Sequence, residues 1–176
     1  MKISVIGYSG GGKSTLAELL GKHYGLETVH LDRFHFLPNW VERSTEEMLS
    51  LVETFLNTHD EWVIDGNYKK CAFQRRMEES DLIIFFNFNR FTCFYRALKR
   101  YFHYKGKSRS SMTEGCNEKM DWAFIKWLLF EGRQKRRRKF FENVVKDYPE
   151  KVVVFKNQRQ LSAYENKVMK LKKNSV

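Results

Sequence analysis

Gly7-Tyr8-Ser9-Gly10-Gly11-Gly12-Lys13-Ser14 is the stretch that decides the fold. It follows the pattern G-x-x-x-x-G-K-[ST], in which glycines let the backbone curl until several N–H groups point at one phosphate. The lysine of this pattern reaches the β- and γ-phosphates of a nucleoside triphosphate, and the hydroxyl after it holds Mg²⁺. The motif therefore predicts a nucleoside triphosphate with Mg²⁺, and we take ATP and Mg²⁺ as the cofactors. The predicted nucleotide-binding residues are Gly7, Ser9, Gly10, Gly11, Gly12, Lys13, Ser14 and Thr15.

The segments on either side of this loop support the interpretation. Residues 2–6 form a short apolar run of the kind that becomes a buried strand, and residues 14–24 place Leu16, Leu19 and Leu20 on one side of a helix. A strand, a glycine loop and a helix in this order are the context that the motif requires. The alternative, a glycine-rich turn followed by a chance Lys-Ser pair, leaves the flanking strand and helix unexplained.

The composition indicates one folded domain over residues 1–176. Hydrophobic residues make up 42% of the chain and aromatic residues 15%, which excludes a disordered protein. The cysteines, Cys71, Cys93 and Cys116, form no C-x-x-C pair, so we expect reduced thiols in a cytoplasmic protein. No apolar run approaches membrane-spanning length. Because the phosphate loop begins at Gly7, we expect no signal peptide.

The net charge of +11 favours an anionic partner. Nucleotide phosphates, an acidic small molecule and nucleic acid all satisfy this charge. A basic surface in contact with solvent explains it equally well, so the charge does not select one partner.

Beyond the first helix, apolar runs alternate with amphipathic segments. Strands are predicted at residues 2–6, 27–31, 62–64, 81–88 and 151–155, and helices at 14–24, 45–55, around 75–76, 90–104, 119–146 and 161–171. This order predicts a three-layer α/β fold of the P-loop NTPase type, with a five-stranded, mostly parallel sheet and helices on both faces. Residues 172–176 are expected to fray.

Local signals refine several of these boundaries. Ser44 and Glu47 form a capping box for the helix that follows, and Asn89 can cap the helix over residues 90–104. Pro38 argues against regular structure, so residues 33–43 are predicted to be a loop at the carboxyl end of a strand. Residues 105–119 are polar and glycine-containing, and we predict that they form a mobile lid between the fourth and fifth strands.

Helical periodicity assigns faces to the two longest helices. In 90–104, Phe91, Phe94, Leu98 and Phe102 share one side, and Arg96 and Arg100 share another. If 119–146 is one continuous helix with a bend at Gly132, its inward side carries Trp122, Ile125, Leu129, Arg133, Arg136, Arg137 and Phe140, whereas Lys135, Arg138 and Lys139 point away. An inward arginine needs a buried anion, which the donor phosphates would supply. The alternative is that this charge run is a solvated face.

The whole outline resembles the nucleoside-monophosphate and shikimate kinase group of P-loop phosphotransferases. A closer resemblance links it to the bacterial family named DNA topology modulation protein, which is grouped with adenylate-kinase-like enzymes. It rests on the strings GYSGGGKST at 7–15, LD at 31–32 with PNW at 38–40, WVIDGNY at 62–68 and MTEGC at 112–116. The chain departs from adenylate kinases after Asp65-Gly66, where Asn67-Tyr68 replaces their F-P-R. This resemblance implies that Asp65 holds Mg²⁺ through water.

These observations predict an acceptor site beside the phosphate loop. Asp32 either binds or deprotonates the acceptor or caps the loop after its strand, and the other predicted acceptor residues are Asp65, Asn67, Tyr68, Arg76, Arg96 and Arg100. Predicted catalytic residues are Lys13, Asp32, Arg109, Arg133, Arg136 and Arg137, and predicted metal residues are Ser14 and Asp65.

We therefore predict a kinase that transfers the ATP γ-phosphate to a small, nucleotide-like acceptor, with no membrane partner. One alternative is an ATP-binding regulator whose basic helix contacts nucleic acid, although no recognised nucleic-acid motif supports it. Another is an ATPase-like interaction protein that has lost its acceptor site. Convergence of the basic residues on the phosphate-loop cleft favours the kinase, whereas a flat basic face elsewhere favours nucleic acid.

Overall fold

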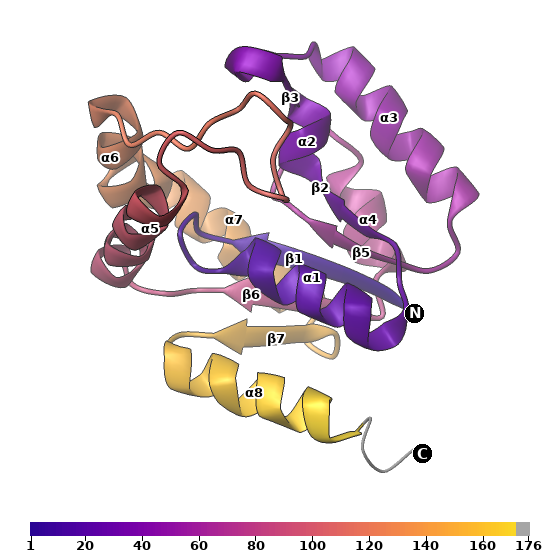
Figure 1. Cartoon of the computed structure of the whole chain (residues 1–176). Coiled ribbons are helices and arrows are strands. Elements are labelled where there is room, and N and C mark those ends of the chain that lie inside the picture. Colours follow the sequence, from indigo (N-terminus) through magenta and orange to yellow (C-terminus); the bar gives the residue numbers. More distant parts are fainter. Residues whose placement is uncertain (172–176) are drawn as a thin grey trace.

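The apolar runs of the sequence assemble into one parallel sheet in the computed structural model, which describes residues 1–171 (Figure 1). The expected fraying of 172–176 lies outside these residues. In the described part of the chain the sheet has five strands in the order β2-β5-β1-β6-β7, and each pairing is parallel. The strands are β1 (Lys2–Gly7), β2 (Thr28–His30), β5 (Trp62–Asp65), β6 (Leu82–Phe86) and β7 (Val152–Phe155). The predicted α/β sheet is confirmed.

Helices cover both faces of this sheet. The main ones are α1 (Lys13–Tyr24), α3 (Thr45–Thr58), α4 (Phe73–Glu79), α5 (Arg90–Tyr104), α6 (Trp122–Leu129), α7 (Lys135–Asp147) and α8 (Gln158–Leu171). Helices α1 and α8 contact each other on one face, whereas α4 and α7 lie behind the sheet in the view of Figure 1. The predicted capping box at Ser44 and the cap at Asn89 are both confirmed.

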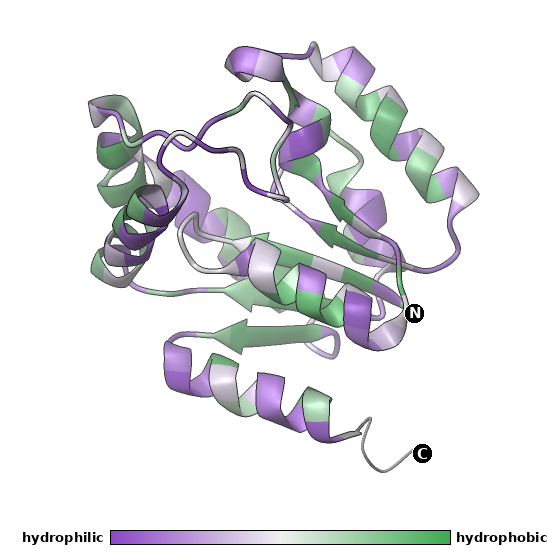
Figure 2. Cartoon of the chain, in the orientation of Figure 1, coloured by the Kyte–Doolittle hydropathy of each residue, from purple (hydrophilic) through white to green (hydrophobic). Residues whose placement is uncertain are grey.

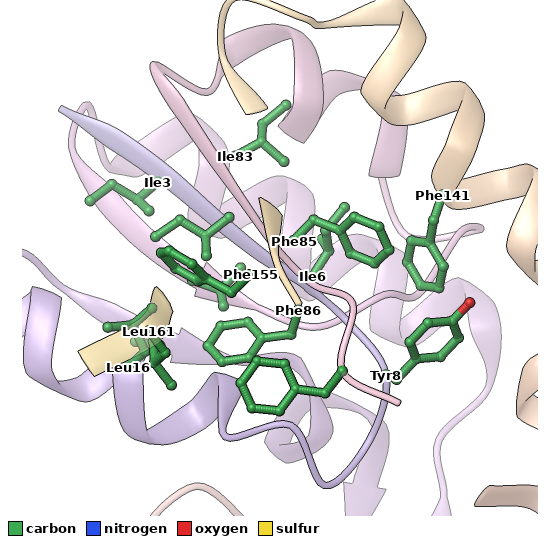
Figure 3. Close-up of a cluster of buried hydrophobic side chains, with 14 of the residues drawn as sticks. Ile3, Ile6, Tyr8, Leu16, Ile83, Phe85, Phe86, Phe141, Phe155 and Leu161 are labelled. Carbon is green, nitrogen blue, oxygen red and sulfur yellow. The ribbon is translucent and has the colours of Figure 1, made fainter. Parts of the chain in front are cut away.

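The core lies between the sheet and these helices. Figure 2 shows that the strands are mostly hydrophobic, and the buried side chains of β1 and β6 meet those of β7, α1, α7 and α8 in Figure 3. Phe141 of α7 stacks on Phe85 of β6 at 4.7 Å between ring centroids and meets Tyr8 edge-on at 5.2 Å. This aromatic packing fixes α7 next to the start of the phosphate loop.

The prediction that residues 33–43 form a loop is wrong, because this segment has regular structure. Strand β2 ends at His30, and a short helix, α2 (Leu31–His35), follows directly. A small antiparallel hairpin comes next, formed by β3 (Phe36–Leu37) and β4 (Val41–Glu42) around the 3-10 turn η1 (Pro38–Trp40). Pro38 is tolerated because it takes the first position of the turn, where no N–H is needed.

The apolar side of α5 is only partly buried. Cys93 and Ala97 are the buried residues of this helix, whereas Phe91 and Phe102 are 73% and 68% exposed. The reason is close backbone packing. A Cβ atom at Gly10 would lie 2.4 Å from the Cys93 carbonyl oxygen, so the phosphate loop lies directly on this helix. The small residues Cys93 and Ala97 are buried in this contact, whereas Phe94 is only partly buried against the core.

Residues 119–146 do not form one helix. Helix α6 ends at Leu129, the 3-10 turn η2 (Glu131–Arg133) follows, and α7 starts at Lys135 after Gln134 adopts an extended conformation. Gly132 is buried at the break, where a Cβ would lie 2.9 Å from the Trp127 carbonyl oxygen. Counting at 100° per residue across this break is therefore invalid, and Trp122, expected to face inward, is 78% exposed.

The lid, residues 105–119, crosses the carboxyl ends of the strands as a loop between α5 and α6 (Figure 1). Three of its side chains tie it to other elements: Thr113 donates to the Phe36 carbonyl oxygen, Cys116 Sγ lies 3.2 Å from the Leu37 carbonyl oxygen, and Ser110 Oγ donates to Glu18. The lid thus lies over the hairpin and α1. Its predicted mobility stays a prediction.

Candidate active site

The phosphate loop owes its shape to close contacts that only glycine permits. Gly7 and Gly10 have φ angles of 126° and 77°, and a Cβ at Gly7 would lie 2.4 Å from the Phe86 carbonyl oxygen. Gly12, with φ of 100°, precedes α1, and no side chain of residues 1–171 caps this helix start. The first N–H groups of α1 are therefore left for an anion.

A cavity of about 950 Å³ opens above this loop at the carboxyl ends of the strands. Most of the predicted site residues line it: Ser9, Gly10, Gly12, Lys13, Ser14, Thr15, Asp32, Asp65, Asn67, Tyr68, Arg96, Arg100, Arg109, Arg136 and Arg137. Four predicted residues do not: Gly7, Gly11, Arg76 and Arg133. The fold thus brings the phosphate loop and all the predicted acceptor residues except Arg76 to one space.

Asp65 is a buried carboxylate in the wall of the cavity. The Ser14 hydroxyl donates to its Oδ2 at 2.6 Å, and His30 Nδ1 lies 3.1 Å from the same oxygen. Burial raises the pKa of Asp65, but the His30 hydrogen bond and the Lys13 charge outweigh it and hold the pKa below its usual range. Asp65 Oδ1 is buried without a hydrogen-bond partner among the described residues. The hydrogen-bonding capacity of this oxygen is therefore unused in the structure.

Sequence reasoning missed His30. No motif marks this residue in the sequence. It belongs to the site because β2 and β5 are adjacent parallel strands whose register places His30 opposite Asp65. Only the strand order, which the sequence does not state, brings the two residues together.

Asp32 and Tyr68 form a second polar pair in the wall of the cavity. The Tyr68 hydroxyl donates to Asp32 Oδ1 at 2.7 Å, and burial together with the Asp32 charge raises the pKa of Tyr68. Asp32 comes from the first turn of α2, not from a strand end as predicted. Phe36 and Trp40 of the hairpin and Met112 of the lid line the space beside this pair. In this part of the cavity wall, the carboxylate of Asp32 is accompanied by aromatic and apolar side chains.

Asn67 lines the cavity, but its side chain supports the phosphate loop. Its Oδ1 accepts from the Gly7 N–H at 2.9 Å, and its Nδ2 donates to the Gly7 carbonyl oxygen at 2.8 Å. The two hydrogen bonds use both ends of the amide.

Arg76 does not reach the acceptor space. Its side chain is fully buried, and its two terminal nitrogens donate to the Gly66 and Tyr68 carbonyl oxygens, each at 3.1 Å. Burial lowers the pKa of Arg76 to about 10. Arg76 lies on the side of α4 that packs against the sheet. Its hydrogen bonds therefore stabilise the turn that follows β5.

Arg133 also lies outside the cavity. Its guanidinium carbon is 3.4 Å from the centroid of the Tyr8 ring, and Nη1 donates to the Phe88 carbonyl oxygen at 2.7 Å. Its second terminal nitrogen lies 3.1 Å from Cys93 Sγ. The break at Gly132 turns Arg133 toward Tyr8 of the phosphate loop. Arg136 and Arg137 line the cavity, but both are exposed and do not lie on a core-facing side as predicted.

Basic side chains converge on the cavity. Lys13, Lys69, Arg96, Arg136 and Arg137 line it without an ion-pair partner among residues 1–171, and sequence reasoning had overlooked Lys69. The Lys69 ammonium lies 3.5 Å from the centroid of the Phe140 ring, and burial followed by the Arg136 and Arg137 charges lowers the pKa of Lys69. Residues 136–139 are all exposed, but only Arg136 and Arg137 line the cavity, and Arg138 and Lys139 do not. This distribution is the one expected of a kinase cleft.

Two further arginines, Arg100 and Arg109, share one carboxylate. Glu118 of the lid is buried, with Oε1 2.6 Å from Arg100 Nη2 and Oε2 2.7 Å from Arg109 Nε. Burial and the Arg109 charge lower the pKa of Arg100. Glu118, which sequence reasoning missed, holds both arginines at the wall of the cavity.

Comparison with known proteins identifies the fold. No protein-family model matches the chain, and no curated protein sequence matches it either. Among solved structures, a gluconokinase from Sinorhizobium meliloti 1021 is similar, with 15% identity, 98% of this chain and 94% of that chain covered, and a TM-score of 0.51. A deoxyadenosine kinase from M. mycoides, with the products dCMP and a flexible dCDP bound, is 16% identical over 100% of both chains, with a TM-score of 0.53. The chain thus shares the α/β fold of these two kinases.

The helices of the structure carry no membrane signal. None of those within residues 1–171 has both the length and the apolar character needed to cross a bilayer.

Proposed function

We propose that this protein is an ATP-dependent phosphotransferase that acts on a small-molecule acceptor. The observation that carries the proposal is one cavity lined by both the phosphate loop and the Asp32–Tyr68 pair. Reactants held side by side in such a space react as if at very high local concentration. The two kinases of the same fold support the reaction class.

The residues of the cavity fit Mg²⁺ together with ATP. The orphan Oδ1 of Asp65 and the Ser14 hydroxyl are hard oxygen ligands of the kind Mg²⁺ prefers, and the cation keeps several waters. No cluster of three or more His, Cys, Asp or Glu side chains among residues 1–171 could hold a metal by itself, so the triphosphate would complete the site. A bound Mg²⁺ would supply neutralisation of phosphate charge.

The protein's own residues would position and stabilise the transferring group. Lys13 would reach the β- and γ-phosphates, and Arg136 and Arg137, which line the same cavity, would supply guanidinium forks. Asp32 accepts a hydrogen bond from the acceptor or takes its proton, and Tyr68 keeps the Asp32 carboxylate in place. Closure of the lid would exclude water during transfer.

Several finer predictions form part of this proposal. They are the single domain with a lid at 105–119, a nucleotide-like acceptor, a cytoplasmic location and membership of the family named DNA topology modulation protein. Arg96, Arg100 and Arg109 keep their predicted roles at the cavity wall. Nucleic-acid binding is no part of the proposal, because Lys13, Lys69, Arg96, Arg136 and Arg137 all line the phosphate-loop cavity.

A phosphoryl-transfer screen tests the proposal. γ-Labelled ATP with Mg²⁺ is incubated with the protein and with panels of nucleotides, nucleosides and small metabolites, and Lys13→Ala serves as the inactive control. We expect label transfer to at least one acceptor by the unaltered protein alone. Absence of Mg-ATP binding by the unaltered protein would overturn the assignment.

A further inference from the structure

Two residues that the proposed chemistry does not use, Glu18 and His30, lie between the cation site and the lid. Ser14 and Glu18 are four residues apart on α1 and therefore lie on the same face of the helix. His30 is the last residue of β2 and is only 5% exposed. All three side chains meet in the corner between α1, β2 and β5.

A continuous series of polar contacts runs through this corner. Ser14 Oγ and His30 Nδ1 both contact Asp65 Oδ2, at 2.6 and 3.1 Å. His30 Nε2 lies 3.5 Å from Glu18 Oε1, and the Ser110 hydroxyl of the lid donates to that same oxygen at 2.7 Å. The series therefore joins the phosphate-loop helix to the lid through the two carboxylates and the ring of His30.

Ser14 and His30 orient the carboxylate of Asp65. Two hydrogen bonds to Oδ2 fix the rotation of the Asp65 carboxylate, which leaves the buried Oδ1 as its free oxygen. When a residue that hydrogen-bonds and orients a metal-binding carboxylate is mutated, metal affinity typically falls by about 10- to 100-fold. Glu18 has polar contacts only with His30 and Ser110 in the described residues. Its position is thus explained by the link to the lid.

We propose that His30 is a positioning residue for Asp65, and that Glu18 couples it to the lid through Ser110. This inference rests on the proposed function, because it assumes that Mg²⁺ and a nucleotide bind beside Asp65. Energetic coupling is reciprocal. Mg-nucleotide binding should therefore protect the lid, and the lid contact should strengthen Mg²⁺-dependent binding.

The first experiment measures Mg²⁺ half-saturation in the binding of a fluorescent ATP analogue, without any acceptor. His30→Ala should raise the half-saturating Mg²⁺ concentration about 10- to 100-fold. His30→Asn should restore it toward the original value, because the Asn amide can donate from nearly the place of Nδ1 but is too short to reach Glu18. His59→Ala is the matched control, since His59 also hydrogen-bonds through Nδ1, to the Phe55 carbonyl oxygen at the end of α3. It should have no effect.

The second experiment follows hydrogen exchange of the lid with and without Mg²⁺ and the ATP analogue. Binding should slow exchange over 105–119 in the unaltered protein, and this slowing should diminish in Ser110→Ala, Glu18→Gln and His30→Asn. Ser108→Ala is the matched control, because Ser108 Oγ lies 3.2 Å from Asn117 Oδ1 within the lid itself. It should leave the Mg²⁺-dependent slowing intact.

The outcomes separate this inference from the proposed function. Unchanged Mg²⁺ half-saturation in His30→Ala, with normal binding by the unaltered protein, overturns the positioning role and leaves the kinase proposal standing. Equal lid protection in Ser110→Ala and Ser108→Ala overturns the coupling. If the unaltered protein binds no Mg-nucleotide, both proposals fail together.

Discussion

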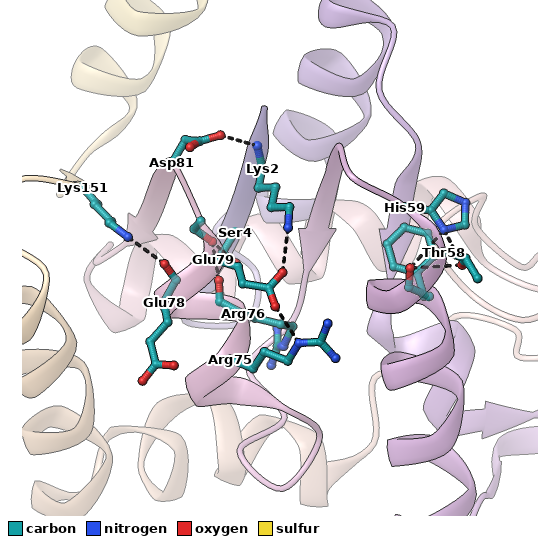
Figure 4. A network of polar contacts seen from close by, with 12 residues as sticks. Lys2, Ser4, Thr58, His59, Arg75, Arg76, Glu78, Glu79, Asp81 and Lys151 are labelled. Carbon is teal, nitrogen blue, oxygen red and sulfur yellow. Dashed lines mark hydrogen bonds and ion pairs between the residues drawn. The ribbon is translucent and has the colours of Figure 1, made fainter.

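The two ends of the sheet differ in how their charged side chains are paired. At the amino end, Lys2 Nζ and Arg75 Nε both contact the carboxylate of Glu79, at 2.7 and 2.6 Å, and the Lys2 N–H donates to Asp81 (Figure 4). At the carboxyl end, Lys13, Lys69 and Arg136 line a cavity without an ion-pair partner among residues 1–171. One end is internally balanced, whereas the other carries an excess of positive charge.

This difference distinguishes stability from function. Partly exposed ion pairs such as those of Figure 4 contribute at most about 1 kcal/mol each. Like charges gathered in a partly desolvated cavity repel one another, and a protein keeps them there when an anion is to be bound. The comparison predicts that substitutions at the carboxyl end change turnover and that substitutions at the amino end change only the free energy of unfolding.

The largest effect is expected at Lys13. Lys13→Ala should lower phosphoryl transfer by about 10²- to 10³-fold or more, because a preorganised charge at the transferring group is lost. Lys2→Ala, at the opposite end of the same sheet, should leave kcat unchanged. The check is steady-state kinetics with labelled ATP, after circular dichroism has shown that both variants fold. Undiminished turnover in Lys13→Ala would contradict the assignment.

The second effect concerns α7. Arg136→Ala and Arg137→Ala should each lower kcat by about 10²-fold, by analogy with the loss of one preorganised donor. Arg138→Ala and Lys139→Ala are the controls, because their side chains do not line the cavity. The expectation fails if the control pair alone has an effect and that effect is on DNA affinity and its salt dependence.

The third effect is on stability. Arg76→Ala should reduce the free energy of unfolding by about 1–3 kcal/mol, because the Gly66 and Tyr68 carbonyl oxygens lose their buried donors. Arg75→Ala, one residue away on the half-buried side of α4, should cost less than about 1 kcal/mol. Urea unfolding of the two variants measures the difference. Equal losses would mean that burial of Arg76 contributes nothing.

The smallest effect is a pH dependence at Glu79. Burial raises the pKa of Glu79, but hydrogen bonds from Lys2 and Arg75 outweigh it and hold the pKa below the usual range. A carboxylate with a depressed folded-state pKa stabilises above its unfolded pKa of about 4.3 and loses this contribution as pH falls through the folded pKa. Glu79→Gln should therefore be less stable than the unaltered protein at pH 7, by less than about 1 kcal/mol. A deficit of the same size at pH 3 would refute this origin.

What the sequence predicts well is local. The strand, loop and helix around Lys13 are encoded in one continuous stretch, since glycines and apolar spacing act over a few residues. The capping residues Ser44 and Asn89 were found for the same reason. These features need no knowledge of what packs against them.

What the sequence predicts poorly depends on packing between distant elements. Arg76 has no sequence mark of burial, because its carbonyl partners come from the turn after β5. The inward positions of 119–146 were miscounted, because periodicity assumes one straight helix and Gly132 ends it. His30 reaches Asp65 only through the order of the strands.

The contact between Gly10 and α5 has a genetic consequence. A Cβ at residue 10 would meet the carbonyl oxygen of Cys93, a backbone atom that every amino acid at position 93 carries. Replacing Cys93 by a smaller residue therefore cannot relieve the clash that Gly10→Ala would create. A selection for suppressors of Gly10→Ala should recover changes that shift the path of α5 and should recover none that merely shrink the side chain at 93.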